Sequence, residues 1–164
     1  MLALAVLALA GCGGGGSKPL ALQEVSTHGA RFTAPGDWRV TRTPKTVSAA
    51  PVEGGDELVS VSIFRLLRPY APALWPRVVP ELDRAAGELA RQLSGTVGSA
   101  RTLTVAGGRA REYELSFQRQ GRGVRERITF VLRDQREYEL LCRWSTGRAE
   151  PAACATLVSS FRPA

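Results

Sequence analysis

Hydrophobic and polar residues alternate along much of the chain, which is the pattern of half-buried β-strands. Between residues 138 and 144, the alternation places Tyr138, Leu140, Cys142 and Trp144 on one face. Similar alternation predicts strands at 31–35, 38–41, 58–64, 101–105, 109–119, 124–132 and 137–144. Turn residues separate the last four of these strands, at 106–108, at 120–123 and around Asp134, and they predict hairpins.

A helical period replaces the alternation in the middle of the chain. Apolar residues recur there at steps of three and four, at Leu74, Val78, Leu82, Ala85, Ala86, Leu89 and Leu93. Pro80 suits a first helical turn and Gly95 suits a helix end, so we predict a helix from Pro80 to Leu93. A shorter helix is predicted from Pro151 to about Phe161, and residues 43–56 are predicted to form a loop.

The order of these elements is three strands, a helix, four strands and a helix. Strands joined by tight turns pair antiparallel. We therefore predict an α+β domain with a single antiparallel sheet flanked by helices.

The first residues do not fit this domain. Residues 1–10 are apolar but too few for a membrane-spanning helix, which needs about 20 residues. They have the length of a signal-peptide core. The sequence Leu9-Ala10-Gly11-Cys12 resembles the bacterial lipobox, although no Lys or Arg precedes the apolar run. A short buried helix with a core cysteine is the alternative interpretation.

The lipobox resemblance implies cleavage before Cys12 and lipidation of its sulfur. It predicts a signal peptide at 1–11, a lipid-anchored Cys12 with a flexible tether at 12–29, and a globular domain at 30–164. The protein would then be lipid-anchored to the membrane on its extracytoplasmic face.

Composition supports a globular protein, with 44% hydrophobic and 23% charged residues among 164. The net charge of +7 comes almost entirely from arginine. This charge favours anionic lipid, an anionic wall polymer or an acidic protein as a partner. No nucleic-acid-binding motif accompanies it, so nucleic acid is not an expected partner.

Two cysteines remain besides Cys12, and both are predicted to point inward. Cys142 lies on the face of Tyr138 and Trp144, and Cys154 shares a helical face with Leu157. In an exported protein such a pair favours a disulfide, whereas a zinc or redox pair is the alternative. His28 is the single histidine, so neither a metal site nor a cofactor is expected.

A cluster of arginines surrounds the turn at 121–123. We consider the hypothesis that these residues contact an anionic surface: Arg119, Arg122, Arg125 and Arg127. The alternative is a solvated face on which arginines pair with glutamates of neighbouring strands. Glu112 with Glu114, and Glu137 with Glu139, share strand faces and would supply those partners.

Two stretches resemble the PsbP/Mog/DcrB-like superfamily. One is FTAPGDW at 32–38, and the other combines EYEL at 137–140 with LVSSFR at 157–162. The resemblance implies a PsbP-like α/β/α sandwich. Many bacterial members are exported lipoproteins, others bind proteins, and the superfamily has no shared catalytic residue set.

The function expected from these observations is a non-enzymatic binding or assembly module of the cell envelope, with another envelope protein or an anionic polymer as its partner. One alternative is a carrier of a small apolar or lipid ligand, held between the helix at 80–93 and the sheet. A second alternative is an enzyme, which would need a buried, paired carboxylate.

Overall fold

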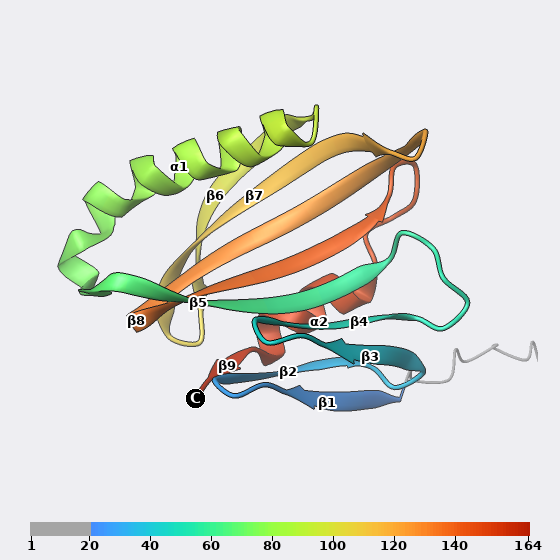
Figure 1. The fold of residues 1–164 in the computed structure, drawn as a ribbon, viewed down its shortest axis with the longest axis horizontal. Helices are drawn as coiled ribbons and strands as arrows, with labels where there is room; N and C mark the ends of the chain where they lie inside the picture. The colour runs from blue at the N-terminus through green and yellow to red at the C-terminus, as the bar shows by residue number, and fades with distance from the viewer. Residues whose placement is uncertain (1–20) are drawn as a thin grey trace, which may run out of the picture.

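Two antiparallel sheets build the protein in the computed structural model, which describes residues 21–164 (Figure 1). The predicted signal peptide and the predicted lipidation site Cys12 lie outside the described residues. So does the first part of the predicted tether.

The larger sheet has the order β3-β4-β5-β8-β7-β6 and every pair in it is antiparallel. Its strands are β3 (Trp38–Arg42), β4 (Thr46–Pro51), β5 (Leu58–Tyr70), β6 (Thr96–Val105), β7 (Gly108–Arg119) and β8 (Arg122–Ser145). The 24-residue β8 folds back on itself, because residues 122–131 pair with β7 and residues 134–143 pair with β5. Asp134 has a φ of 51° at the reversal, and the Thr146 amide donates to the Gly123 carbonyl across the two halves. The hairpin expected around Asp134 is present.

The smaller sheet has the order β1-β2-β9, with β1 (Leu22–Ser26), β2 (Ala30–Pro35) and β9 (Arg162–Pro163). The tether predicted for residues 12–29 is therefore wrong for residues 22–26. Val25 is fully buried, and the Gln23 amide donates to the Pro35 and Trp38 carbonyls at 2.8 and 2.7 Å. These contacts hold β1 on the domain.

The prediction of a single sheet flanked by helices is wrong. The smaller sheet and one helix together cover one face of the larger sheet, and the other helix crosses the opposite face (Figure 1). Sequence reasoning missed three strands, β1, β4 and β9, which are short or poor in large apolar residues. Strand β4 lies within residues 43–56, so the loop predicted there is wrong for residues 46–51. In β4, only Val47 and Ala49 mark the buried face.

Three helical segments complete the fold: η1 (Pro72–Leu74), α1 (Trp75–Gln92) and α2 (Ala152–Ser160). Helix α1 begins five residues before the predicted start, so Pro80 lies inside it. Proline removes one helical hydrogen bond, but Trp75 and Leu82 are buried on either side of it. Leu82 packs in the hydrophobic core between the helix and the sheet. None of the helices in residues 21–164 is long and apolar enough to cross a membrane.

Each face of the larger sheet has its own hydrophobic core. Under α1, the core contains Leu82, Ala86, Ala90, Tyr113, Leu115, Phe117, Val124, Ile128 and Phe130. On the opposite face, side chains of both sheets and of α2 pack around Tyr138, Leu140, Cys142 and Trp144. The four residues expected to share a strand face do so.

Candidate functional site

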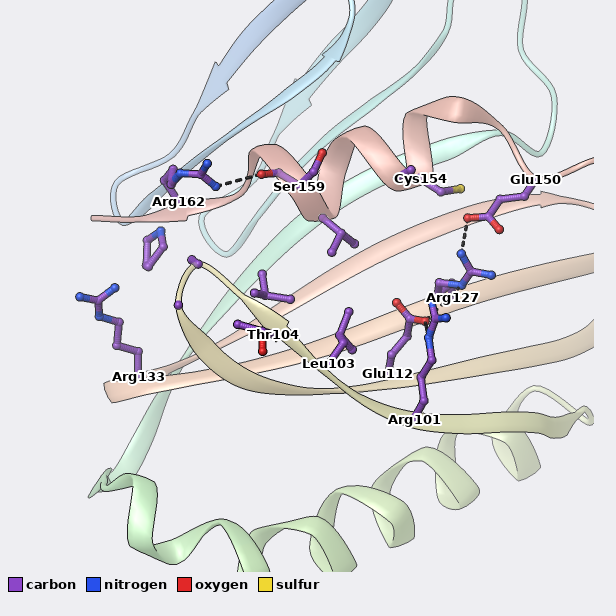
Figure 2. Close-up of a pocket in the computed structure, with 16 residues that line it drawn as sticks. Arg101, Leu103, Thr104, Glu112, Arg127, Arg133, Glu150, Cys154, Ser159 and Arg162 are labelled. Carbon is purple, nitrogen blue, oxygen red and sulfur yellow. Dashed lines mark hydrogen bonds and ion pairs between the residues drawn. The ribbon is translucent and has the colours of Figure 1, made fainter.

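An open groove of about 780 Å³ lies between α2 and the β6–β7 hairpin (Figure 2). We call it the α2 groove. One wall is the exposed side of α2, with Ala155, Val158 and Ser159, and the other is the end of β6, with Leu103 and Val105. Both walls are regular elements of the fold, so the groove is a fixed feature of the surface.

Charged groups lie at the two ends of the α2 groove (Figure 2). Arg133 and Arg162 lie toward one end. Arg101, Glu112, Arg127 and Glu150 gather at the other. Leu103 lies between the two ends, and Val105 and Val158 also line the groove. The groove therefore combines a cationic end, apolar lining and an ion-paired end.

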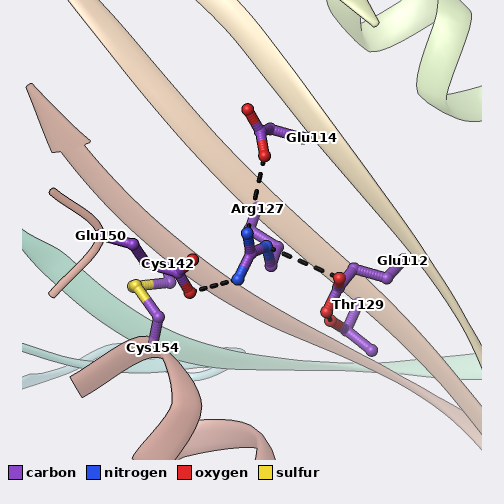
Figure 3. Close-up of a disulfide and its surroundings, with 7 residues drawn as sticks. All are labelled: Glu112, Glu114, Arg127, Thr129, Cys142, Glu150 and Cys154. Carbon is purple, nitrogen blue, oxygen red and sulfur yellow. Dashed lines mark hydrogen bonds and ion pairs between the residues drawn. A yellow bond between two sulfur atoms is a disulfide. The ribbon is translucent and has the colours of Figure 1, made fainter. Parts of the chain in front are cut away.

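Arg127 is the centre of the ion-paired end (Figure 3). Its guanidinium lies 3.6 Å from Glu112 Oε1 and 3.5 Å from Glu114 Oε2, and it also pairs with Glu150. The same guanidinium lies over the Trp144 ring, 5.6 Å from the ring centroid. One arginine thus connects β7, β8 and the loop before α2.

Glu112 is the most buried carboxylate of the groove, with a side chain 5% exposed. Arg101 Nε donates to its Oε1 at 2.6 Å, and the Thr129 hydroxyl donates to its Oε2 at 3.1 Å. A buried carboxylate is tolerated when it is paired and hydrogen-bonded in this way. The expected pairing of Glu112 and Glu114 with arginines of a neighbouring strand is present. The expected solvated face is wrong for Glu112, which is buried.

The disulfide between Cys142 and Cys154 fixes the helical wall of the groove (Figure 3). It joins the second half of β8 to α2 with a Cα–Cα distance of 5.4 Å. Both cysteines are buried against the core, as the strand and helix patterns indicated.

Solved structures of other proteins share this architecture. The solution structure of CyanoP, the cyanobacterial PsbP of Synechocystis sp. PCC 6803, matches with a TM-score of 0.62 at 17% identity, over 95% of this chain and 99% of that one. The fold is PsbP-like. LpqN of Mycobacterium tuberculosis, described as involved in cell envelope biogenesis, matches with a TM-score of 0.59 at 15% identity, over 89% and 92% of the two chains.

A crystal structure from Bacteroides thetaiotaomicron also matches this chain, with a TM-score of 0.60 at 10% identity. The match covers 82% of this chain but only 45% of that one, so this chain spans less than half of that protein. No protein-family model and no curated protein matches the sequence. At these identities the similarity establishes the fold and leaves the activity open.

The larger sheet separates the four arginines of the predicted cluster, Arg119, Arg122, Arg125 and Arg127, onto its two faces. Arg125 and Arg127 pair with Glu114 on the face that carries the α2 groove. Strand alternation places Arg119 and Arg122 on the opposite face. Arg122 is 3.3 Å from the buried Asp56. The four side chains therefore do not form one continuous surface.

A second set of carboxylates lies on the face of the larger sheet that α1 covers. Arg143 Nη2 lies 2.6 Å from Oε2 of the buried Glu126. Burial, followed by the nearby charges of Glu137 and Glu126, raises the pKa of Glu139 to about 7. Burial also raises the pKa of Glu137. The expected pairing of these two glutamates with arginines is not among the ion pairs of the described residues.

Side chains fill the space between α1 and the larger sheet. This is the space in which the alternative function, a carrier of an apolar ligand, would hold its ligand. Leu82 and Ala86 of α1 pack on Leu115 and Ile128. Tyr113 donates to Asp83 of α1 at 2.5 Å, which closes the interface with a polar contact. Within residues 21–164, no group of three metal-ligating side chains comes together.

Proposed function

We propose that the protein is a non-enzymatic binding module of the cell envelope, anchored through an acylated Cys12 and holding a segment of another envelope protein in the α2 groove. The lipobox-like residues 9–12 support the anchor. The Cys142–Cys154 disulfide supports an extracytoplasmic location, because disulfides persist in oxidising compartments. The same fold in LpqN, a protein described as involved in cell envelope biogenesis, is in keeping with this location.

The lining of the α2 groove is the observation that carries the proposal. Leu103 and Val158 provide apolar surface, while Arg133 and Arg162 provide positive charge at one end. A polypeptide segment with apolar side chains and a carboxylate at that end complements this lining.

The edge of the larger sheet gives such a segment a way to bind. Strand β6 is the last strand in the sheet order, and within residues 21–164 it pairs only with β7. An extended partner can therefore add to β6 as a further strand, with main-chain hydrogen bonds supplying affinity. Its alternate side chains would then lie toward the groove.

The carboxylates of the α2 groove are engaged by arginine, which favours binding over catalysis. Arg101 and Arg127 hold Glu112, and Arg127 also holds Glu150. A glycosidase-type pair needs one carboxyl in an apolar pocket and a second free to act as a base or nucleophile. Neither groove carboxylate is in that situation.

The test is crosslinking in intact cells followed by purification of the protein, with two matched variants. Ala155 and Ala152 are both exposed on α2, but only Ala155 lines the groove. Ala155→Arg should lower recovery of a stoichiometric partner about tenfold, the effect of losing roughly 1.4 kcal/mol of binding. Ala152→Arg adds the same charge and should leave recovery unchanged. Equal recovery with both variants would refute the groove as the binding site.

The anchor is tested separately by fractionation. Cys12→Ala should move the protein from the membrane fraction to the soluble fraction, because acylation is then impossible. A Cys12→Ala protein that stays with the membrane would contradict the anchor and leave the groove test unaffected.

A further inference from the structure

A second cleft, of about 540 Å³, lies where the two sheets meet beside the C-terminal end marked in Figure 1. We call it the turn cleft. Residues 26–29, at the β1–β2 turn, line one side, and residues 42–47, at the β3–β4 turn, line another. Ile63 of β5 and Arg136 of β8 complete the lining. The turn cleft shares no lining residue with the α2 groove.

The turn cleft is lined by three permanent cations and by no aspartate or glutamate side chain. Arg42, Lys45 and Arg136 line it together with His28. At the ion-paired end of the α2 groove, by contrast, Arg101 and Arg127 have glutamate partners. Among residues 21–164, no aspartate or glutamate side chain forms an ion pair with any of these three cations. The cleft therefore concentrates positive charge that an anion can neutralise.

Arg136 is positioned by the backbone of the β1–β2 turn. A Cβ added at the buried Gly29 would lie only 2.5 Å from Arg136 Nη1 and 3.3 Å from Ile63 Cδ1. Glycine at this position thus leaves the space that the guanidinium occupies. Nη1 donates to the Ala164 backbone oxygen at 3.4 Å, a contact that uses one of the five guanidinium N–H groups.

Both turns that line the cleft are held by their own hydrogen bonds. The Thr27 hydroxyl accepts the Gly29 and Ala30 amides at 3.0 Å each. The Thr43 hydroxyl accepts the Thr46 amide at 3.0 Å, and the Thr43 amide donates to the Thr46 carbonyl at 2.8 Å. Fixed turns reduce the conformational entropy lost when a ligand binds.

We propose that the turn cleft binds the phosphoryl group of a phosphate ester. Guanidinium groups match the oxygens of phosphate in bidentate geometry, and lysine adds a point charge. The volume lies in the range of small-molecule sites, so the cleft holds the phosphoryl group and part of the group esterified to it. A soluble phosphate ester and a phospholipid headgroup present the same chemistry here.

The test is an NMR titration of the full chain in detergent micelles, following the backbone amide signals of Thr43, Lys45 and Thr46. The probes are inorganic phosphate, sn-glycerol 3-phosphate, and micelles doped with phosphatidylglycerol or with zwitterionic phosphatidylcholine. Saturable shifts with glycerol 3-phosphate support the proposal and identify a soluble ester as a source. Shifts only with phosphatidylglycerol support it and identify a lipid headgroup. No saturable shift with any phosphate probe overturns it.

Variants separate a built site from general charge attraction. Arg136→Gln and Arg42→Gln should each weaken binding about tenfold or more, as expected for loss of a charge-assisted contact. Arg119→Gln removes the same charge from an exposed arginine outside the cleft and should leave affinity unchanged.

Gly29→Ala supplies a second test, because the added Cβ would displace the Arg136 guanidinium without changing the net charge. We expect this variant to weaken binding as well. The backbone should tolerate alanine, since the φ angle of Gly29 does not require glycine. Equal weakening by Arg119→Gln and Arg136→Gln would overturn the proposal. The result is independent of the α2 groove, since neither Arg136 nor Gly29 lines it.

Discussion

Arg127 and Arg125 lie two residues apart on the same face of β8, yet replacing them with methionine should have different effects on stability. The Arg127 side chain is 19% exposed and contacts three carboxylates and the Trp144 ring. The Arg125 side chain is 48% exposed, and among residues 21–164 its one ion-pair partner is Glu114, at 3.5 Å. Methionine keeps most of the length of the side chain and removes the charge.

The magnitude follows from what each substitution leaves behind. Removing one partner of a fully buried ion pair costs about 3–5 kcal/mol. Glu112 keeps Arg101 and Thr129 after Arg127→Met, so we expect the free energy of unfolding to fall by about 2 kcal/mol, part of it from the lost contact with Trp144. Arg125→Met removes a surface pair and should cost less than about 1 kcal/mol.

Urea unfolding of the full chain measures both values. For a slope of about 2 kcal/mol per molar urea, Arg127→Met should lower the midpoint by about 1 M, with the slope unchanged. Glu112→Gln should cost less in the Arg127→Met background than alone, by about 1 kcal/mol of coupling. Equal midpoints for Arg127→Met and Arg125→Met would refute the central position of Arg127.

Two further predictions concern the disulfide and the carboxylates under α1. Cys142→Ser with Cys154→Ser should lower the free energy of unfolding by about 3 kcal/mol, as expected for a closed loop of this length; calorimetry that finds no lower melting temperature would contradict this. Because the folded-state pKa of Glu139, about 7, lies above its ordinary value of about 4.3, folding favours the protonated form and stability falls as the pH rises through this window. Glu139→Gln should remove about 1–2 kcal/mol of the fall between pH 5 and pH 8, a value reduced for solvent screening, whereas the exposed Glu53→Gln should not; an unchanged pH dependence in Glu139→Gln would count against the raised pKa.

Strand alternation predicted the centre of the fold well. Long strands such as β7 and β8 carry large apolar residues at every second position, and Tyr113, Leu115 and Phe117 reach the same core as expected. The smaller sheet escaped prediction because β1 has a single fully buried apolar side chain, Val25, and β9 has two residues. Strands β1 and β9 are held in place by pairing with β2, and Val25 of β1 packs in the core. The local sequence pattern of β1 and β9 does not indicate these contacts.

The candidate sites were harder to predict than the fold. Clustering of arginines along the sequence drew attention to residues 119–127, although strand alternation places Arg119 and Arg122 on one face of the sheet and Arg125 and Arg127 on the other. Arg42 and Arg136 are far apart in sequence, and the register of the strands brings both to the turn cleft. Buried pairs such as Glu112 with Arg127 look like surface pairs in the sequence, because only α2 and its preceding loop cover them.

The most direct test of the proposed function is photo-crosslinking from α2 in intact cells. A photoreactive phenylalanine derivative at position 155 would lie in the α2 groove, whereas the same residue at position 152 would lie outside it. We expect one discrete crosslinked protein from position 155 and none from position 152. The same product from both positions, or no product from position 155, would contradict binding of an envelope protein in the groove.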